Sequence, residues 1–251
     1  MNDVLNVVLT HQKPAAVARM LDWWREVVPA ETILLAHGGR SDAFAGVGFR
    51  NKIPVSCPRL RTTNHQRERQ SYTDVFHSIS DWLRGRDFNY VYFAEYDHLP
   101  LAKDLNARQL VLLNQEGADV LGHELLQVDG SNQPHYLYHR SLPGFEEFWS
   151  TLSCRTERGT VLSMFGSGTF WTREAFEAVA AVQEPFPVYL EIWLPTLAHH
   201  LGFRIREFPE DRRHIRGQGE LENLIPEARA AGVWTLHPVK RLWLDSKPGG
   251  L

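Results

Sequence analysis

Short runs of apolar residues alternate along the chain with longer segments in which apolar positions repeat every three to four residues. The run from Val4 to Thr10 is rich in Val and Leu and predicts a buried strand. Pro14 suits a first helical position, and apolar residues follow it at helical spacing, namely Val17, Met20, Leu21, Trp24, Val27 and Val28. A second buried strand is predicted from Thr32 to Ala36.

The alternation continues through the middle of the chain. A helix is predicted from Ser71 to Leu83 and a strand from Phe88 to Ala94. Asp104 is predicted to cap a helix that runs to about Glu116, because Asp is a favoured capping residue. A further strand is expected from Asp119 to Gly122.

The pattern weakens between residues 125 and 160, where Pro, Gly and aromatic residues are frequent. This segment is predicted to be either an antiparallel insertion or a loop that faces the substrate. Beyond it, we expect a helix over Thr172–Val182 with Thr172 as its cap, a helix over Glu191–Leu201, and a strand over Phe203–Phe208.

Alternating strands and helices with apolar strands predict an α/β fold, in which a mostly parallel central sheet is covered by helices on both faces. The chain shows no repeat, no low-complexity tract and no Gly/Ser linker. We therefore expect one domain over residues 1–251.

Composition excludes several classes of protein. The net charge of −3 disfavours non-specific binding of nucleic acid, which usually requires a basic surface. Cys57 and Cys154 lie far apart, without the spacing of a zinc site or the density of a disulfide scaffold, so reduced thiols are expected. The start lacks the pattern of a signal peptide and no apolar run reaches ~18 residues, so no transmembrane segment and a cytoplasmic location are expected.

Chemistry is concentrated where the strand near Phe93 ends, because Glu95, Asp97 and His98 follow it directly. Hard divalent cations prefer oxygen ligands, and open α/β sheets bind ligands at the carboxyl ends of their strands. The pattern therefore indicates a cation site that neutralises a diphosphate. An acidic turn that opens a loop is an equal alternative on spacing alone.

Six short motifs occur in order along the chain: the strand ending near Thr10, the turn His37–Asp42, Glu95–His98, Phe165–Phe176, Tyr189–Pro195, and Leu236–Lys240. In this order and approximate spacing, they resemble the motifs of glycosyltransferases of the GT-A fold, in the broad family 2-like group. The resemblance covers most of the chain. It implies a Rossmann-like nucleotide-diphospho-sugar transferase domain with a nucleotide-binding half, 1–122, and an acceptor-side half with a C-terminal loop, 123–251.

The resemblance also implies an activity. It is the transfer of a sugar from a nucleotide-diphosphate sugar to a glycan or other hydroxyl acceptor, with Mn²⁺ or Mg²⁺ and with inversion. The metal ligands would be Asp97 and His237, and the catalytic base would be Glu191. The donor would be bound by residues near the strand ends and the glycine-rich motif, namely Thr10, His11, Arg67, Glu95, Gly166 and Gly168.

Each of these residues also has a purely structural interpretation. Asp97 can cap a loop, Glu191 can be an ordinary charge at a helix start, and glycines are common in tight turns. Aromatic residues such as Trp171 and Trp193 are expected in the core. His98 is expected to be partly exposed and without a metal role.

Three departures from the family pattern leave two other functions open. His37-Gly38-Gly39 replaces an acidic pair, Glu95-Tyr96-Asp97 is not a strict Asp-x-Asp, and Ile192 stands where Asp is common. A non-catalytic relative that binds a nucleotide or glycan fits these departures. Twelve histidines also permit a metal-dependent hydrolase, although the chain lacks HExxH and HxH motifs.

Overall fold

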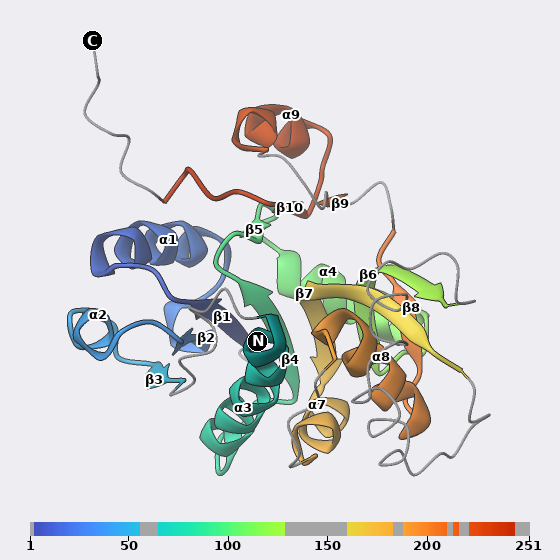
Figure 1. Cartoon of the computed structure of the whole chain (residues 1–251). Coiled ribbons are helices and arrows are strands. Elements are labelled where there is room, and N and C mark those ends of the chain that lie inside the picture. The colour runs from blue at the N-terminus through green and yellow to red at the C-terminus, as the bar shows by residue number, and fades with distance from the viewer. Residues whose placement is uncertain are drawn as a thin grey trace.

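A seven-stranded sheet lies at the centre of the structure, which is a computed structural model (Figure 1). Its order is β3-β2-β1-β4-β7-β6-β8. The strands are β1 (Val4–Thr10), β2 (Ile33–His37), β3 (Lys52–Pro54), β4 (Tyr90–Glu95), β6 (Val120–Gln127), β7 (Leu162–Thr172) and β8 (Ile205–Glu207). Only β7 is antiparallel to its neighbours β4 and β6, so the prediction of a mostly parallel sheet is confirmed.

The structure describes residues 3–55, 65–128, 160–182, 188–209, 213–215 and 221–243, without the side chains of 65–71 and 213–215. Both cysteines, the greater part of the 125–160 segment and the side chain of Arg67 lie outside the described residues. The part of that segment that is described pairs with β7 in antiparallel register, with Leu126 opposite Ser163 and Gln127 opposite Leu162. No described helix is long and apolar enough to cross a membrane.

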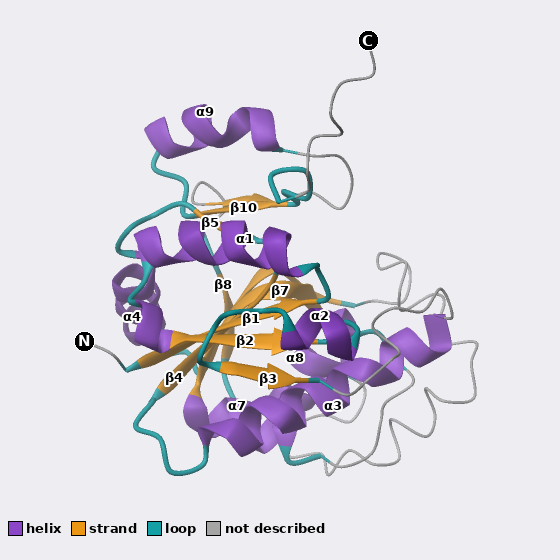
Figure 2. Cartoon of the chain, turned by 90° about the vertical axis from the view of Figure 1, so that its left-hand side faces the viewer, coloured by secondary structure: helices purple, strands orange, loops and turns teal. Residues whose placement is uncertain are grey.

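Helices cover both faces of the sheet, which confirms the α/β class (Figure 2). One face packs against α1 (Pro14–Val27) and α4 (Leu105–Gln115), and the other against α3 (His65–Leu83), α7 (Arg173–Ala180) and α8 (Leu190–His200). The alternation of side chains along a strand separates the two cores, because Leu5, Val7 and Leu9 face one core and Val4 and Val8 the other. Trp171 and Trp193 are buried in the first core, as predicted.

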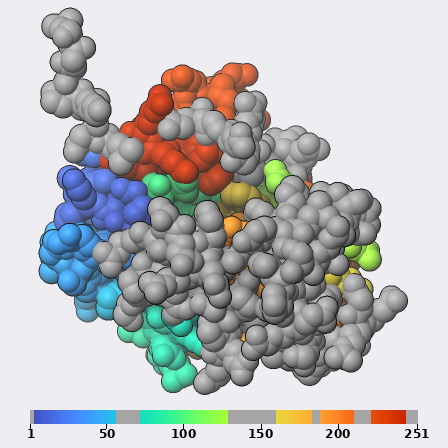
Figure 3. Space-filling view, in the orientation of Figure 1, coloured from blue at the N-terminus to red at the C-terminus, as the bar shows by residue number. Residues whose placement is uncertain are grey.

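A small second sheet, absent from the sequence-based prediction, lies between α1 and α9 (Ile225–Ala230) (Figure 2). Its order is β5 (Leu99–Pro100), β10 (Thr235–His237) and β9 (Arg213–Ile215). In Figure 3 the C-terminal segment, in red, lies directly against the N-terminal residues, in blue. Two tryptophans fasten this layer, since Trp23 Nε1 donates to Pro100 O at 2.8 Å and Trp243 Nε1 to Tyr96 O at 2.8 Å.

Several element boundaries differ from the prediction. Helix α3 begins at His65 rather than Ser71, and β6 continues to Gln127. Short elements that carry too few residues for a clear period were missed, namely α2 (Ser41–Ala45), β3, and the 3₁₀ turns Ala30–Thr32 and Glu222–Leu224. The Thr172 cap is confirmed, since its Oγ1 accepts from the Ala175 N–H at 3.3 Å.

Asp104 is the one predicted cap that does not act as a cap. It stands at the N-cap position of α4, but its side chain makes no capping hydrogen bond. Its Oδ1 instead accepts from Arg108 Nε at 2.6 Å. The nearby guanidinium satisfies the carboxylate in place of the helix N–H groups, and it lowers the pKa of Asp104.

Candidate functional site

The carboxyl ends of β1 and β4 bring the first group of predicted residues together. The two strands are parallel with Leu9 opposite Glu95, and the Tyr96 N–H donates to Leu9 O at 2.9 Å. They open into a cavity of about 210 Å³, which lies where open α/β sheets bind ligands. Its walls are formed by Leu9, Thr10, His11, Tyr72, Glu95, Tyr96, Asp97 and Lys240. Four predicted site residues therefore share one cavity: Thr10, His11, Glu95 and Asp97.

Asp97 is a buried carboxylate with a basic group on each side. Only 4% of the residue is exposed. Its Oδ1 lies 3.6 Å from His237 Nε2, and its Oδ2 lies 3.6 Å from Lys240 Nζ. Burial acts to raise the pKa of Asp97, but His237 and Lys240 together outweigh burial and hold the pKa below its ordinary value. Asp97 is thus an ionised group that is kept away from bulk water.

His237 reaches Asp97 from the second sheet. It ends β10, and the Val239 N–H donates to Asp97 O at 2.9 Å, which holds the C-terminal segment against the β4 turn. The ring of Phe165 packs edge-on against His237 with centroids 4.6 Å apart. The structure therefore brings together the two residues that the sequence pairs as metal ligands, although 140 positions separate them in the chain.

The donor set at Asp97 suits a cation that arrives with phosphate oxygens. Among the described residues, no group of three or more His, Cys, Asp or Glu side chains could hold a metal ion by itself. Asp97 Oδ1 and His237 Nδ1 are nevertheless buried, and the described residues offer neither of them a hydrogen bond. Mg²⁺ is commonly bound by one or two carboxylates together with substrate phosphates and water. Asp97 fits such a site, and His237 stands beside it.

Glu95 is the second carboxylate of the cavity, and its proton is held more tightly than usual. The Tyr72 hydroxyl donates to its Oε1, and the Glu95 N–H donates to Ser167 Oγ at 2.8 Å. Burial raises the pKa of Glu95 to about 7, and the negative charges of Asp97 and Glu191 act in the same direction. Tyr72 and His237 oppose the rise without cancelling it.

The raised pKa of Glu95 predicts a specific pH dependence of stability. The folded state holds the Glu95 proton more tightly than the unfolded state, so the free energy of unfolding falls as pH rises from about 5 to about 7 and is level above. Glu95→Gln should remove this contribution, which is roughly 2 kcal/mol. Urea denaturation at about pH 5 and about pH 8 measures it.

The exposed Glu174, in the first turn of α7, provides the control for that measurement. Glu174→Gln should keep the pH dependence of the wild type. Identical pH dependence in Glu95→Gln and the wild type would show that Glu95 has an ordinary pKa.

Glu191 lies close to this group, at the beginning of α8. It occupies the first turn of the helix, after the N-cap Tyr189, and is partly buried. Its charge contributes to the raised pKa of Glu95, which places the two carboxylates within electrostatic reach of each other. The predicted base and the predicted donor site are therefore neighbours in space.

Gly166 and Gly168 have packing partners within the protein. A Cβ on Gly166 would lie 2.4 Å from Leu190 Cδ1, and one on Gly168 would lie 2.1 Å from His98 Cε1. Gly168 also has a φ of +77°, a conformation that favours glycine. The absence of both side chains is thus required by contacts inside the protein, and the approach of this backbone to a sugar stays a prediction.

His98 is fully buried, so the prediction of a partly exposed side chain is wrong. Its ring lies between those of His123 on β6 and His237 on β10, with centroids 5.5 Å and 5.7 Å away, and Gly168 on β7 packs against it. Burial, and then the two neighbouring histidines, lower the pKa of His98 well below its ordinary value. His98 is therefore a neutral packing residue behind the cavity.

His37, which ends β2, bonds to the local backbone. It is 1% exposed. Its Nδ1 accepts from the Gly39 N–H at 3.2 Å, and its Nε2 donates to Gln12 O at 3.0 Å, so the ring joins the loops that follow β1 and β2. The buried ring thus connects two loops at the carboxyl ends of these strands.

Sequence reasoning missed three residues of the site: Tyr72, Ser167 and Lys240. Tyr72 had a usable signal, because a helix starting near Ser71 places it in a first turn near the strand ends. Lys240 follows His237 by three positions within a motif already singled out. Ser167 had no signal, since its contact with Glu95 depends on the antiparallel entry of β7.

Comparisons with known proteins find solved structures of similar fold but no family to which the chain belongs. No protein-family model matches the chain, and no curated protein matches it. Among solved structures, it is similar to the bifunctional IspDF of Campylobacter jejuni, with 9% identity, 84% of this chain and 50% of that one covered, and a TM-score of 0.46. A mannosyltransferase from Pyrobaculum calidifontis, in complex with GDP-Man and Mn²⁺, is similar as well. The match has 13% identity, covers 83% of this chain and 55% of that one, and has a TM-score of 0.42.

Mouse xyloside xylosyltransferase 1 is similar over nearly the whole of both chains. The match has 11% identity, covers 93% of this chain and 97% of that one, and has a TM-score of 0.44. The chain spans about half the length of the first two structures. Glycosyltransferases are thus among the proteins that this fold resembles, but at these scores the likeness carries no argument about activity.

Proposed function

We propose that the chain is a glycosyltransferase of GT-A type that moves a sugar from a nucleotide-diphosphate sugar to a hydroxyl acceptor, with inversion. The observation that carries the proposal is the position of Asp97. This buried, ionised carboxylate stands beside His237, in the wall of a cavity at the carboxyl ends of β1 and β4. Such a group is suited to hold a cation against a diphosphate.

Donor binding is assigned to the cavity wall. Thr10 and His11 follow β1 and would contact the nucleotide, while Glu95 would accept from a ribose hydroxyl. Asp97 and His237 would hold Mn²⁺ or Mg²⁺, and a cation bound there supplies the positive charge that stabilises the leaving diphosphate. The Arg67 contact with phosphate remains a prediction, since its side chain lies outside the described residues.

Glu191 is assigned the proton transfer. Its carboxylate takes the proton from the acceptor hydroxyl as that oxygen bonds to the anomeric carbon and the bond to the diphosphate oxygen breaks. The helix N-terminus stabilises its negative charge and weakens it as a base, whereas partial burial acts in the opposite direction.

Glu191→Gln tests this assignment. It should lower donor turnover by about 100-fold or more, because general-base catalysis contributes 10²–10⁴-fold. The affinity for the nucleotide should stay unchanged, since the amide keeps the shape of the carboxylate. Glu174→Gln, also in the first turn of a helix, is the matched control and should keep full turnover. Equal turnover in the two variants would remove Glu191 from the catalytic step.

A panel of nucleotide sugars, monitored for donor turnover, tests the function itself. Release of nucleoside diphosphate from one donor, dependent on Mn²⁺ or Mg²⁺ and accelerated by a hydroxyl acceptor, is expected. Binding of nucleotide without turnover of any donor would instead identify a non-catalytic relative. The departures at His37 and Ile192 keep that alternative open, because Ile192 has no carboxylate and the ring nitrogens of His37 are bonded to backbone.

The hydrolase alternative finds less support in the structure. Of its candidate histidines, His37 is bonded to backbone on both ring nitrogens and His98 is fully buried. No three-ligand metal group occurs among the described residues. A thermal shift produced by Zn²⁺ alone, with none from nucleotides and Mn²⁺, would favour the hydrolase over the transferase.

A further inference from the structure

Lys240 lines the cavity, and its ammonium group pairs with Asp97, the carboxylate that would bind the cation. Its Nζ is 3.6 Å from Asp97 Oδ2, on the side of the carboxylate away from His237. The Lys240 side chain is 51% exposed, whereas that of Asp97 is 6% exposed. A flexible, half-exposed ammonium therefore neutralises a buried carboxylate from the solvent side.

The backbone fixes the place of Lys240 without fixing its side chain. The Val239 N–H donates to Asp97 O at 2.9 Å, so the residue before Lys240 is bonded to Asp97 itself. A lysine is a point charge on a flexible stem with several rotatable bonds, so its ammonium can move by several ångströms while its Cα stays in place. Lys240 can therefore leave Asp97 and still remain at the cavity.

Two physical effects act on Lys240 when a ligand arrives. A divalent cation on Asp97 repels the ammonium, because like charges at short range in a partly buried site are unfavourable. A diphosphate in the same cavity attracts it, because Lys is a common partner of phosphate. The two effects act in the same direction and move the ammonium from the carboxylate to the diphosphate.

We propose that Lys240 is an exchangeable counter-ion: it occupies Asp97 in the free protein and transfers to the diphosphate when cation and nucleotide bind together. This inference rests on the proposed function. Without nucleotide, Lys240 competes with the cation for Asp97. When cation and nucleotide bind together, Lys240 instead stabilises the complex by pairing with the diphosphate. Binding of each ligand then favours the other, and the coupling is reciprocal, as linkage requires.

Lys240→Met, which keeps most of the length of the side chain and removes its charge, tests the proposal. Mn²⁺ binding without nucleotide is measured by the electron paramagnetic resonance of the free ion, and binding of UDP or GDP in saturating Mn²⁺ by calorimetry. The variant should bind Mn²⁺ alone about fivefold more tightly, and the nucleotide about tenfold more weakly, in the ordinary range of coupling between sites.

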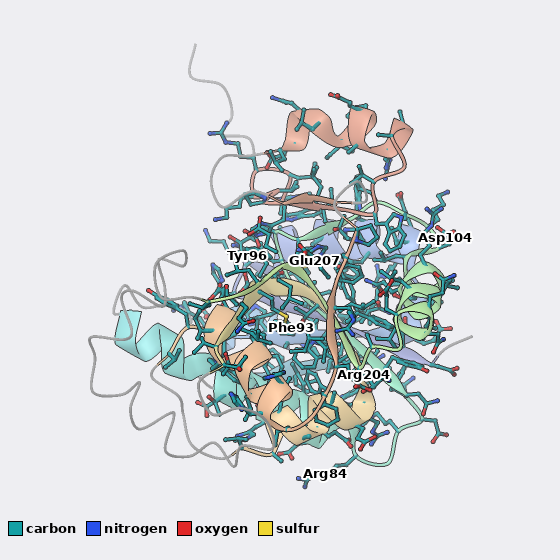
Figure 4. The ribbon with its side chains drawn as sticks, turned by 90° about the vertical axis from the view of Figure 1, so that its right-hand side faces the viewer. Arg84, Phe93, Tyr96, Asp104, Arg204 and Glu207 are labelled. Carbon is teal, nitrogen blue, oxygen red and sulfur yellow. The ribbon has the colours of Figure 1, made fainter. Side chains whose placement is uncertain are left out.

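The matched control is Lys103→Met. Lys103 lines a different cavity, beside Asp104, and Figure 4 shows Asp104 well apart from Tyr96, which lines the cavity of Asp97. This control should leave both affinities unchanged. Lys240→Arg, which keeps the charge, should bind Mn²⁺ alone as weakly as the wild type, and this rescue separates an effect of charge from one of packing.

Unchanged or weaker binding of Mn²⁺ alone by Lys240→Met would overturn the proposal, and so would unchanged affinity for the nucleotide. Failure of the proposed function looks different, because the wild type would then bind no nucleoside diphosphate in Mn²⁺. If the wild type binds nucleotide with Mn²⁺ and Lys240→Met matches it in both measurements, only the exchange at Lys240 is wrong.

Discussion

Asp97→Asn is expected to abolish the Mn²⁺-dependent part of nucleotide binding. The amide keeps the size of the carboxylate but loses the charge that holds the cation, and the cation in turn holds the diphosphate. The loss should be tenfold or more in nucleotide affinity with Mn²⁺, or about 1.4 kcal/mol or more. Thermal shift with UDP and GDP, with and without Mn²⁺, measures it.

Asp104→Asn serves as the control for Asp97→Asn. Asp104 is not among the residues that line the cavity of Asp97, and Figure 4 shows it well apart from Tyr96, which lines that cavity. Its ion pair with Arg108 is exposed, so its loss should have little effect on stability. The control should therefore keep the full Mn²⁺-dependent shift. A shift of the same size in Asp97→Asn would mean that another group binds the cation.

Gly168→Ala should lower the free energy of unfolding by about 3 kcal/mol or more, because two separate costs act at this residue. The backbone has a φ of +77°, where a side chain costs about 1 kcal/mol. The new Cβ would also lie 2.1 Å from Cε1 of the fully buried His98, so the ring or the strand must move. Urea denaturation at neutral pH measures the loss.

Two other glycines separate the two costs. Gly85 has a φ of +72° with open space around it, so Gly85→Ala should show the backbone cost alone. Gly48 has neither constraint, and Gly48→Ala should be close to neutral. Truncating His98 to Ala should make Gly168→Ala less costly, since the clash disappears. If Gly168→Ala is no worse than Gly85→Ala, the contact between Gly168 and His98 is not as the structure places it.

The elements that could be predicted are those long enough to show a continuous apolar run or a regular repeat of apolar positions. Val4–Thr10 was found as a strand with its observed bounds, and the helix after Pro14 ends at Val27, one residue from its last predicted apolar position. The second sheet could not be predicted, because β5 has two residues and β10 three, and their pairing joins segments more than a hundred positions apart. The antiparallel direction of β7 depends likewise on long-range pairing with β4.

The part of the candidate site that could be predicted is the part whose residues follow directly on the end of a strand. Glu95 and Asp97 are separated only by Tyr96 in the sequence, and their meeting with Thr10 follows from the parallel pairing of β1 and β4. The chain alone does not show which charges act on Asp97, because His237 and Lys240 approach it through the unpredicted second sheet. For the same reason the burial of His98 was missed.

The central claim is that Asp97 binds a cation and that this cation binds a diphosphate. Calorimetric titration of the wild-type protein with UDP and GDP, in Mn²⁺ and in a chelator, tests it most directly. At least one nucleotide should bind about tenfold or more tightly in Mn²⁺, corresponding to about 1.4 kcal/mol or more. Equal affinity in Mn²⁺ and chelator, or no binding of either nucleotide, would contradict the account.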